Sequence, residues 1–433
     1  MNTFRKYQRA VNFLESINNM TSKDYMRKDK ADRSYYVDRL RYFLKLLNNP
    51  QDGFKIIHIT GTSGKGTITN YLHKILSVAG FKVGSYFSPH STTSIERIKV
   101  NDVYISQKDF IELVDYVKPY LKTAIMKSPY GCPSYYEIFF TLAFLYFHKK
   151  NCDYVVLEAG LGGTYDATNV VKNTKIALIT NVGYDHMDVL GNTLSLIAID
   201  KAGIIKKDCT FITTETRPKI LEIFKKRCEK VGAKYIALKP KDSNANQILA
   251  QSAAQKLGFK ESIIKKGLTE TTLPCRFEAV QKEPLVIIDG AHNPPKLEYL
   301  RKKIEKLKYN KLILIFAIAA NKNHKKCLKA ILPVADELYL TRFLKQTRKA
   351  ADLKELYDIT RLYRSKLPIK VHIDPWKALK DALNELEKGD LLLITGSFFL
   401  AGELRTKWTN EEAILKTRSS FKKPSSKNGK KLL

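Results

Sequence analysis

Residues 54–67, FKIIHITGTSGKGT, combine a β-branched run, a glycine-rich turn, a lysine and a hydroxyl, which together can hold a chain of phosphates. The three glycines allow a tight turn in which backbone N–H groups point at an anion. Lys65 supplies a positive charge for the outer phosphates, and the Thr67 hydroxyl can bind a phosphate oxygen or its Mg²⁺. The stretch therefore predicts a phosphate-binding loop.

The elements around this turn fit that prediction. Residues 54–60 have the composition of a buried strand, and residues 67–78 carry apolar side chains at helical spacing, so the loop lies at a helix N-terminus that favours an anion. Only Thr62 and Ser63 separate the first glycine from Gly-Lys, where the common pattern has four residues. A plain strand-to-helix turn with an exposed lysine is the alternative interpretation.

Strand-like runs alternate with helical runs along most of the chain, which is typical of α/β domains with parallel sheets. The polar stretch TETTLPCR interrupts the series, and we expect a domain boundary near Pro274. The fold class expected is α/β, with an N-terminal P-loop mononucleotide-binding domain containing a parallel sheet, followed by a smaller Rossmann-like α/β domain. The expected ranges are residues 1–273 and 274–410, with a basic, disordered tail over 411–433.

Composition excludes several classes of protein. The net charge is +32, from 75 Lys and Arg against 43 Asp and Glu, but it is spread along the chain without an arginine-rich helix, zinc finger or aromatic RNA-binding signature. Nucleic acid is therefore not the expected partner, and the positive surface is expected to gather small polyanions. The longest apolar runs, 138–147 and 312–320, are shorter than the roughly 20 residues that span a bilayer.

The remaining compositional signals favour a cytoplasmic protein. The six cysteines are scattered, with no C-x-x-C pair, so we expect reduced thiols and neither a zinc site nor a disulfide scaffold. The first residues, 1–17, fit an amphipathic helix better than a targeting segment.

Three polar side chains follow predicted strands and are candidates for a metal site beside the loop. Ser88 follows the strand ending near Tyr86, Glu158 ends the run DYVVLE, and His186 follows the strand ending near Thr180. The carboxyl ends of parallel strands are where open sheets bind ligands. A carboxylate at the end of an apolar strand is costly unless paired or metal-bound, which favours Glu158. A histidine such as His186, taken by itself, is more often an ordinary hydrogen-bonding residue than a metal ligand.

Eight segments in order carry a resemblance to a known family: GTSGKGT, SPHSTTSIERI, LEAGLGGTYDATN, ITNVGYDHMDVLG, IAIDKAGI, LPCRFE, DGAHNP and TGSFFLAGE. With these motifs the chain, from about Tyr7 to Arg405, resembles the Mur ligase superfamily and, within it, folylpolyglutamate synthase and dihydrofolate synthase. The short loop counts in favour of this family, since the resembling ligases carry the same contraction.

The resemblance implies a role for each matching residue. The ATP phosphates would be held by Thr62, Gly64, Lys65, Gly66 and Thr67. Two Mg²⁺ ions would be bound, the first by Ser88 and Glu158 and the second by His186. Lys201 stands where this superfamily carries a carbamylated lysine, which presents a carboxylate to the metal site instead of an ammonium. Arg276, Asp289 and His292 would bind the nucleotide. Ser397 would bind the incoming amino acid, and Asp166 and Ala167 would bind a pterin ring.

The implied reaction is ATP-dependent addition of L-glutamate to a pterin acid through an acyl phosphate, in a protein expected to be a monomer; a requirement for a monovalent cation is left open. Departures from the family pattern fall mainly near the acceptor, at Ser94, Ile95, Thr164 and Tyr165, with further ones at Asp200 and Cys275. Dihydropteroate, tetrahydrofolate polyglutamates or both therefore remain open as acceptors. A Mur-type ligase for another acid, such as a cell-wall precursor, and a nucleic-acid-associated ATPase are the alternatives.

Overall fold

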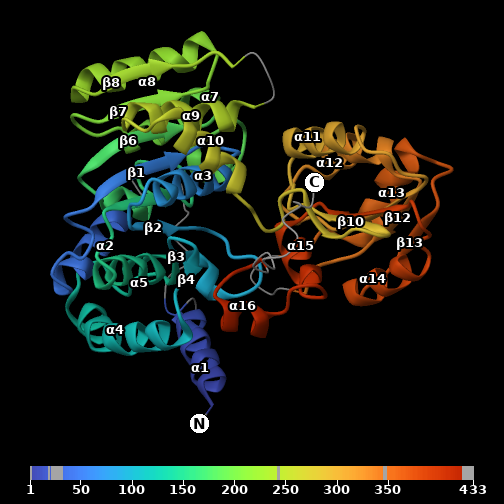
Figure 1. The fold of residues 1–433 in the computed structure, drawn as a ribbon, viewed down its shortest axis with the longest axis horizontal. Helices are drawn as coiled ribbons and strands as arrows, with labels where there is room; N and C mark the ends of the chain where they lie inside the picture. Colours follow the sequence, from blue (N-terminus) through green and yellow to red (C-terminus); the bar gives the residue numbers. More distant parts are fainter. Residues whose placement is uncertain (1, 18–19, 21–32, 241–243, 345–348, 422–433) are drawn as a thin grey trace. The chain divides into compact units, whose positions relative to one another are not determined.

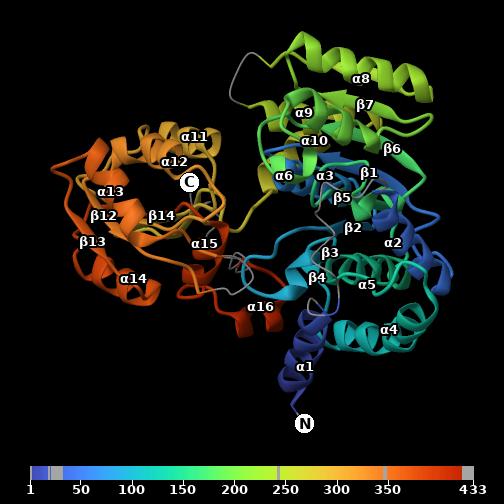
Figure 2. The same cartoon turned by 180° about the vertical axis from the view of Figure 1, so that it is seen from behind.

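The computed structural model describes residues 2–17, 20, 33–240, 244–344 and 349–421, and Figures 1 and 2 show the fold from opposite sides. The chain divides into two compact units. Unit 1 comprises Met1–His90 and Ser94–Thr272, and unit 2 comprises Ser91–Thr93 and Leu273–Leu433. Each unit is described by itself.

Unit 1 is built on an eight-stranded sheet with the order β4-β3-β2-β5-β1-β6-β7-β8. The strands are β1 (Lys55–Thr60), β2 (Val83–Tyr86), β3 (Ile98–Val100), β4 (Val103–Tyr104), β5 (Tyr154–Glu158), β6 (Thr174–Ile179), β7 (Thr210–Thr213) and β8 (Lys234–Ala237). The run from β2 to β8 is parallel, whereas β3 and β4 add an antiparallel edge. The expected parallel sheet is confirmed, and the short strands β3, β4 and β8 were not predicted.

Helices cover both faces of this sheet (Figures 1 and 2). They are α1 (Thr3–Ser16), α2 (Ser34–Leu46), α3 (Lys65–Val78), α4 (Gln107–Lys127), α5 (Tyr135–Lys149), α6 (Met187–Leu190), α7 (Leu194–Lys201), α8 (Pro218–Val231), α9 (Ala245–Lys256) and α10 (Glu261–Glu270). Along β6, Ile176 and Leu178 pack with α3, α9 and α10, while Ala177 and Ile179 pack with α7 and α8. The period-two alternation of a strand thus supplies an apolar surface to each helical layer.

Unit 2 has a six-stranded sheet with the order β13-β12-β11-β14-β10-β9, in which only β9 is antiparallel. The strands are β9 (Glu278–Gln281), β10 (Leu285–Ile288), β11 (Leu312–Phe316), β12 (Glu337–Leu340), β13 (Ile369–Val371) and β14 (Leu391–Thr395). The helices are α11 (Pro294–Ile304), α12 (His324–Ile331), α13 (Leu353–Tyr363), α14 (Pro375–Asn384), α15 (Phe398–Arg405) and α16 (Glu411–Thr417). Helices α11 to α13 pack on one face and α14 and α15 on the other, as expected of a Rossmann-like domain.

The C-terminal segment differs in part from the expected tail. Residues Glu411–Thr417 form α16, whose Ile414 and Leu415 are buried, so ordered chain continues past residue 410 because this short helix has an apolar side to bury. Residues 422–433 of the expected tail lie outside the described residues. Among the residues described, no helix is long and apolar enough to cross a membrane.

Candidate active site

The glycine-rich loop joins β1 to α3 and ends at the start of that helix. Gly64 is the N-cap residue, with a left-handed backbone (φ 86°), and no side chain of the described chain caps the helix. The N–H groups of Lys65, Gly66 and Thr67 therefore lie in the first turn, where helices leave such groups unsatisfied. Backbone donors and helix dipole together suit a phosphate group at this end of α3.

The loop is held against the segment that follows β6. The Thr62 amide donates to Asn181 O over 3.0 Å, and the Ser63 amide donates to Asn181 Oδ1 over 3.0 Å. A β-carbon on Gly61 would lie 1.8 Å from Thr180 Oγ1, so only glycine fits there. The Thr62 hydroxyl accepts from the Gly183 amide at 2.8 Å, which shows a loop-ordering role for this expected nucleotide contact.

The ammonium of Lys65 lies over the loop instead of pointing into solvent. Its Nζ donates to Gly61 O at 2.9 Å, and no acidic residue occupies the first turn of α3. The ammonium and the first-turn amides thus face the same short stretch of chain. An anion bound there would meet a point charge and several N–H donors at once.

The predicted metal ligands follow neighbouring parallel strands. Ser88 comes after β2, Glu158 ends β5 and His186 comes after β6, and these strands lie beside β1 in the order β2-β5-β1-β6. Their carboxyl ends therefore reach the same edge of the sheet as the loop. Glu158 is 7% exposed, and a β-carbon on Gly66 would lie 3.4 Å from its Oε2, which places the carboxylate beside the first turn of α3.

His186 has a left-handed backbone (φ 50°) and precedes α6. Its Nε2 lies 3.9 Å from Asp185 Oδ1, and its side chain is 30% exposed. The imidazole is thus partly accessible and lies near an acidic side chain. A partly exposed imidazole in this position can bind a metal ion or accept and donate hydrogen bonds.

The oxygen atoms of Ser88 and Glu158 are of the kind that binds Mg²⁺ when phosphate groups bind the same ion. The described residues contain no group of three or more His, Cys, Asp or Glu side chains that could hold a metal by themselves. Mg²⁺ is commonly bound by one or two protein ligands together with waters and substrate phosphates. The buried Glu158 carboxylate beside the first turn of α3, with the Ser88 hydroxyl at the same edge of the sheet, meets this requirement.

Tyr136 is a residue of this region that the sequence reasoning missed. Its hydroxyl is buried and has no well-formed hydrogen bond to any described residue, although it lies near the Ser88 hydroxyl. Burial raises the pKa of Tyr136 well above 10, and the charges of Asp166 and Glu158 act in the same direction. The sequence signal that could have revealed Tyr136 is the presence of a tyrosine within the apolar helix α5, since a buried phenol normally has a polar partner.

Lys201, at the end of α7, is 3% exposed. Burial, and then the charge of Lys65, lower its pKa to about 7, against the opposing influence of Asp200, Asp185 and Asp166. A substantial fraction of this amine is therefore neutral near pH 7. A neutral amine is the form that can react with CO₂ to give a carbamate.

The segment expected to meet a pterin ring is ordered by its own carboxylate. Asp166 is 7% exposed and accepts from the amides of Leu161 at 2.8 Å and Thr168 at 2.9 Å, while Ala167 begins the short helix Ala167–Val170. Burial raises the pKa of Asp166 despite these hydrogen bonds. The Asp166 carboxylate thus holds the conformation of its own loop. Ala167 is 9% exposed and offers little accessible surface to a ligand.

Two of the departures from the family pattern contact each other. The Thr164 hydroxyl donates to Asp200 O at 2.8 Å, and Asp200 Oδ1 accepts from the Gly163 amide at 2.7 Å. Tyr165 beside them is 39% exposed. Ser94 and Ile95 are buried in the short helix Ser94–Arg97, away from solvent. The altered positions are therefore built into ordered structure.

Asn246 of α9 is a second residue that the motifs did not reveal. A β-carbon on Gly64 would lie 2.3 Å from Asn246 Oδ1, so this amide lies directly against the loop. An asparagine near the start of a helix is an ordinary sequence feature, and only packing of α9 on α3 places it here.

In unit 2, the three predicted nucleotide-binding residues surround the turn after β10. Asp289 accepts from the amides of Phe277 and Ala291, each at 2.7 Å. The guanidinium of Arg276 lies 4.8 Å from the Phe398 ring centroid, and a β-carbon on Gly290 would lie 2.7 Å from its Nη1. Burial raises the pKa of Asp289, which the charge of Arg276 opposes. These contacts bring Arg276 and Asp289 to one turn.

His292 and Ser397 also have local partners in unit 2. Burial, and then the charges of Lys296 and Lys322, hold the pKa of His292 well below 6.5, so the imidazole is neutral near pH 7. Its Nδ1 lies 2.9 Å from Gly290 O. The Ser397 hydroxyl accepts from the Phe399 amide at 3.1 Å and caps α15, which is a structural use of this expected substrate contact.

Comparison with known proteins identifies the family of the chain. Residues 59–279 match the Mur ligase middle domain, and residues 275–398 match the Mur ligase glutamate ligase domain. The dihydrofolate synthase/folylpolyglutamate synthase of Bacillus subtilis is 30% identical over 412 residues, covering 85% of this chain and 94% of that protein.

Solved structures show the same fold. The Mycobacterium tuberculosis folylpolyglutamate synthase complexed with ADP and AMPPCP superposes with a TM-score of 0.83 at 22% identity, over 94% of this chain and 99% of that one. Escherichia coli FolC in complex with DHPP and ADP has a TM-score of 0.76 at 25% identity, over 95% of this chain and 98% of that one.

The two α/β units and the glycine-rich loop between β1 and α3 are those of a Mur-ligase type of protein. The chain belongs to the Mur ligase superfamily and to its folylpolyglutamate synthase/dihydrofolate synthase family. The resemblance seen in the motifs is thereby confirmed.

Proposed function

We propose that this protein is an ATP-dependent ligase that joins L-glutamate to a pterin acid and releases ADP and phosphate. The main support for the proposal is that the Glu158 carboxylate lies beside the first turn of α3. There Lys65 and the loop amides can bind an anion. Support also comes from the B. subtilis relative, named for both synthase activities, and from the E. coli structure with ADP and DHPP.

The chemistry needs this arrangement because a carboxylate is a poor electrophile. Transfer of the ATP γ-phosphoryl group to the acid gives an acyl phosphate, and attack by the glutamate amine forms the amide and expels phosphate. Lys65 and the first-turn amides would hold the nucleotide phosphates and offset their charge. Ser88, Glu158 and His186 would hold Mg²⁺, which supplies charge neutralisation at the transferring phosphoryl group.

The remaining predicted residues keep their proposed roles. Thr62, Gly64, Gly66 and Thr67 would line the phosphate site, and a carbamate on Lys201 would help to organise the metal. From unit 2, Arg276, Asp289 and His292 would bind the nucleotide and Ser397 the glutamate. Asp166 and Ala167 would meet the pterin ring. The second Mg²⁺ ion and a monomeric state belong to the same proposal, and omission of K⁺ and Na⁺ from the assay tests whether a monovalent cation is required.

The acceptor acid is best decided by direct assay. Purified protein would be incubated with ATP, Mg²⁺ and glutamate, together with dihydropteroate, tetrahydrofolate or its diglutamate, and the products weighed by mass spectrometry. A product heavier by one glutamate residue, formed together with ADP, is the expected result. The acceptors that react separate a dihydrofolate synthase from a folylpolyglutamate synthase or a bifunctional enzyme.

The same assay tests the two alternatives. ADP release that requires a cell-wall precursor and not a pterin acid would replace the proposed acceptor while keeping the ligase chemistry. ADP release driven by DNA or RNA without glutamate would overturn the ligase proposal altogether.

A further inference from the structure

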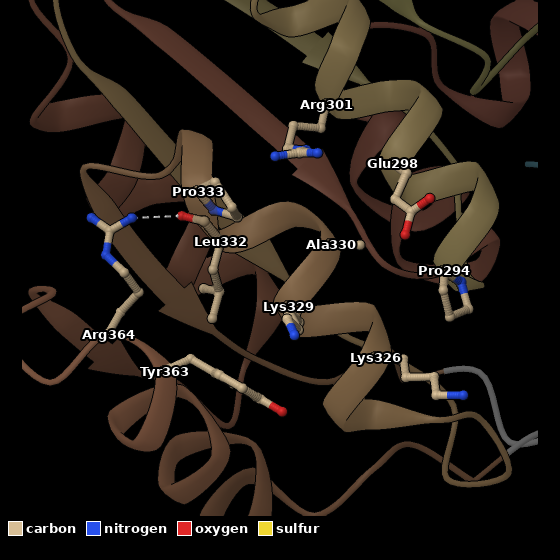
Figure 3. Close-up of a pocket in the computed structure, with 10 residues that line it drawn as sticks. All are labelled: Pro294, Glu298, Arg301, Lys326, Lys329, Ala330, Leu332, Pro333, Tyr363 and Arg364. Carbon is tan, nitrogen blue, oxygen red and sulfur yellow. Dashed lines mark hydrogen bonds between the residues drawn. The ribbon is translucent and has the colours of Figure 1, made fainter.

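Unit 2 contains a cavity of about 590 Å³ that none of the proposed site residues line. Figure 3 shows its lining residues, which come from α11, α12, the short helix Leu332–Val334 and the end of α13. The volume lies within the range of roughly 300–1,000 Å³ that is usual for small-molecule sites. The cavity is therefore large enough for a ligand of several rings or of a ring with a chain.

Positive charge gathers around this cavity from separate elements. The cationic lining side chains are Arg301 of α11, Lys326 and Lys329 of α12, and Arg364 after α13. They outnumber the one lining carboxylate, that of Glu298. Like charges brought together in a concave site repel one another and raise the local concentration of anions.

Two of these cations are placed for recognition. The Arg364 guanidinium donates to Leu332 O at 3.0 Å and Ala335 O at 3.3 Å, which fixes its plane at the cavity wall (Figure 3). The Arg301 side chain is 30% exposed and its Nη1 lies 3.6 Å from Glu305 Oε1, so this lining guanidinium is partly accessible and held near the end of α11.

The rest of the lining is apolar and partly aromatic. Pro294 and Pro333 leave apolar surface accessible and Tyr363 is 40% exposed, whereas Ala330 and Leu332 are buried and contribute little surface. A simple inorganic anion would leave this surface in water. A ligand that buries a flat ring on it while placing anionic groups on the cations would use both parts of the lining.

We propose that this cavity is a second ligand site, for a small molecule with an aromatic body and two or more carboxylates. The product class of the proposed reaction, a pterin conjugate with a chain of glutamates, has this chemistry, so the choice of probe rests on the proposed function. Binding here would let the protein hold a polyglutamylated product apart from the phosphate loop.

Equilibrium dialysis with radiolabelled pteroyl-triglutamate, in the absence of ATP, tests the site. Lys326→Glu/Lys329→Glu should weaken binding at the second site about tenfold or more. Lys302→Glu/Lys325→Glu is the matched control, because it makes the same charge change at exposed residues of α11 and α12 that do not line the cavity. Lys326→Arg/Lys329→Arg should retain binding.

The outcomes are distinct. If Lys326→Glu/Lys329→Glu binds one fewer probe molecule than its matched control, the second site is supported. This result would hold even for a protein that does not ligate glutamate. In that case only the proposed function would be rejected. Equal binding by the two double variants, both melting as wild type does, would overturn the second site. Tripolyphosphate that binds there as tightly as the pteroyl probe would overturn the aromatic, polycarboxylate ligand class.

Discussion

Glu158, at the end of β5, lies against Gly66 in the first turn of α3, where a β-carbon would come 3.4 Å from Glu158 Oε2. A carboxylate that approaches the phosphate loop this closely would repel a bound nucleotide unless a cation stood between them. The proximity of these two residues is thus the physical reason to expect a divalent ion here, and it leads to the first prediction.

Glu158→Ala and Lys65→Ala should each lower the ligation rate by about a hundredfold or more, because each removes one side of the charge balance at the transferring phosphoryl group. Steady-state assays at saturating ATP and Mg²⁺ measure the effect, and thermal melts show whether the fold persists. Lys74→Ala, on the same helix, serves as the control for Lys65→Ala. A Lys65→Ala protein with wild-type turnover would contradict the phosphate-loop assignment.

Lys201 should make stability depend on pH. Its pKa is lowered from 10.5 to about 7 in the folded state, so between these values the unfolded chain binds more protons. In CO₂-free buffer the free energy of unfolding should therefore gain an increasing contribution from Lys201 as pH rises from about 7 to 10. Urea titrations of wild type and Lys201→Met should show a smaller rise in the variant, and exposed Lys265→Met should leave the slope unchanged.

The carbamate on Lys201 predicts a second behaviour of the same residue. Native mass spectrometry in bicarbonate buffer should show one added CO₂ on the wild type and none on Lys201→Ala. A small carboxylic acid such as acetate should restore part of the lost activity of Lys201→Ala, because it returns a carboxylate to the vacated space. A fully active enzyme with unmodified lysine would remove the carbamate hypothesis.

Tyr136→Phe should separate stability from ligand binding. Loss of a buried hydroxyl without a partner should leave the free energy of unfolding unchanged or raise it by about 1 kcal/mol. If the hydroxyl serves the metal site, the same change should weaken ATP binding in Mg²⁺, which calorimetry measures. Tyr86→Phe is the control, because Tyr86 packs on Tyr136 but its hydroxyl faces Arg97. Equal ATP affinity in wild type and both variants would remove Tyr136 from the site.

Arg39 of α2 and Glu137 of α5 form a buried pair, with Nη2–Oε1 and Nε–Oε2 distances of 2.8 and 2.9 Å. Their side chains are 5% and 4% exposed. Either Arg39→Ala or Glu137→Ala should cost about 3–5 kcal/mol of unfolding free energy, since each leaves one buried charge unpaired. Arg39→Ala/Glu137→Ala should cost clearly less than the sum of the two single changes in urea unfolding. A strictly additive double variant would show that the pair is not coupled.

Much of the architecture follows from local pattern. The β-branched run of β1, the glycines after it and the helical spacing of α3 identify the phosphate loop without tertiary information, because each depends on residues close in sequence. The alternation of strands and helices likewise predicts two α/β units. The strands β3, β4, β8, β9 and β13 escaped prediction because they are very short or only partly buried, so they carry little periodic signal.

The motifs, their order and the type of chemistry follow from the amino-acid sequence alone, since residue identity sets which groups can bind phosphate and metal. Which side chains share an environment depends on the tertiary structure. Packing of α9 brings Asn246 to Gly64, burial in α5 leaves the Tyr136 hydroxyl beside Ser88, and burial beside Lys65 lowers the pKa of Lys201. Desolvation and proximity depend on segments far apart in the chain, and no local pattern of residues encodes them.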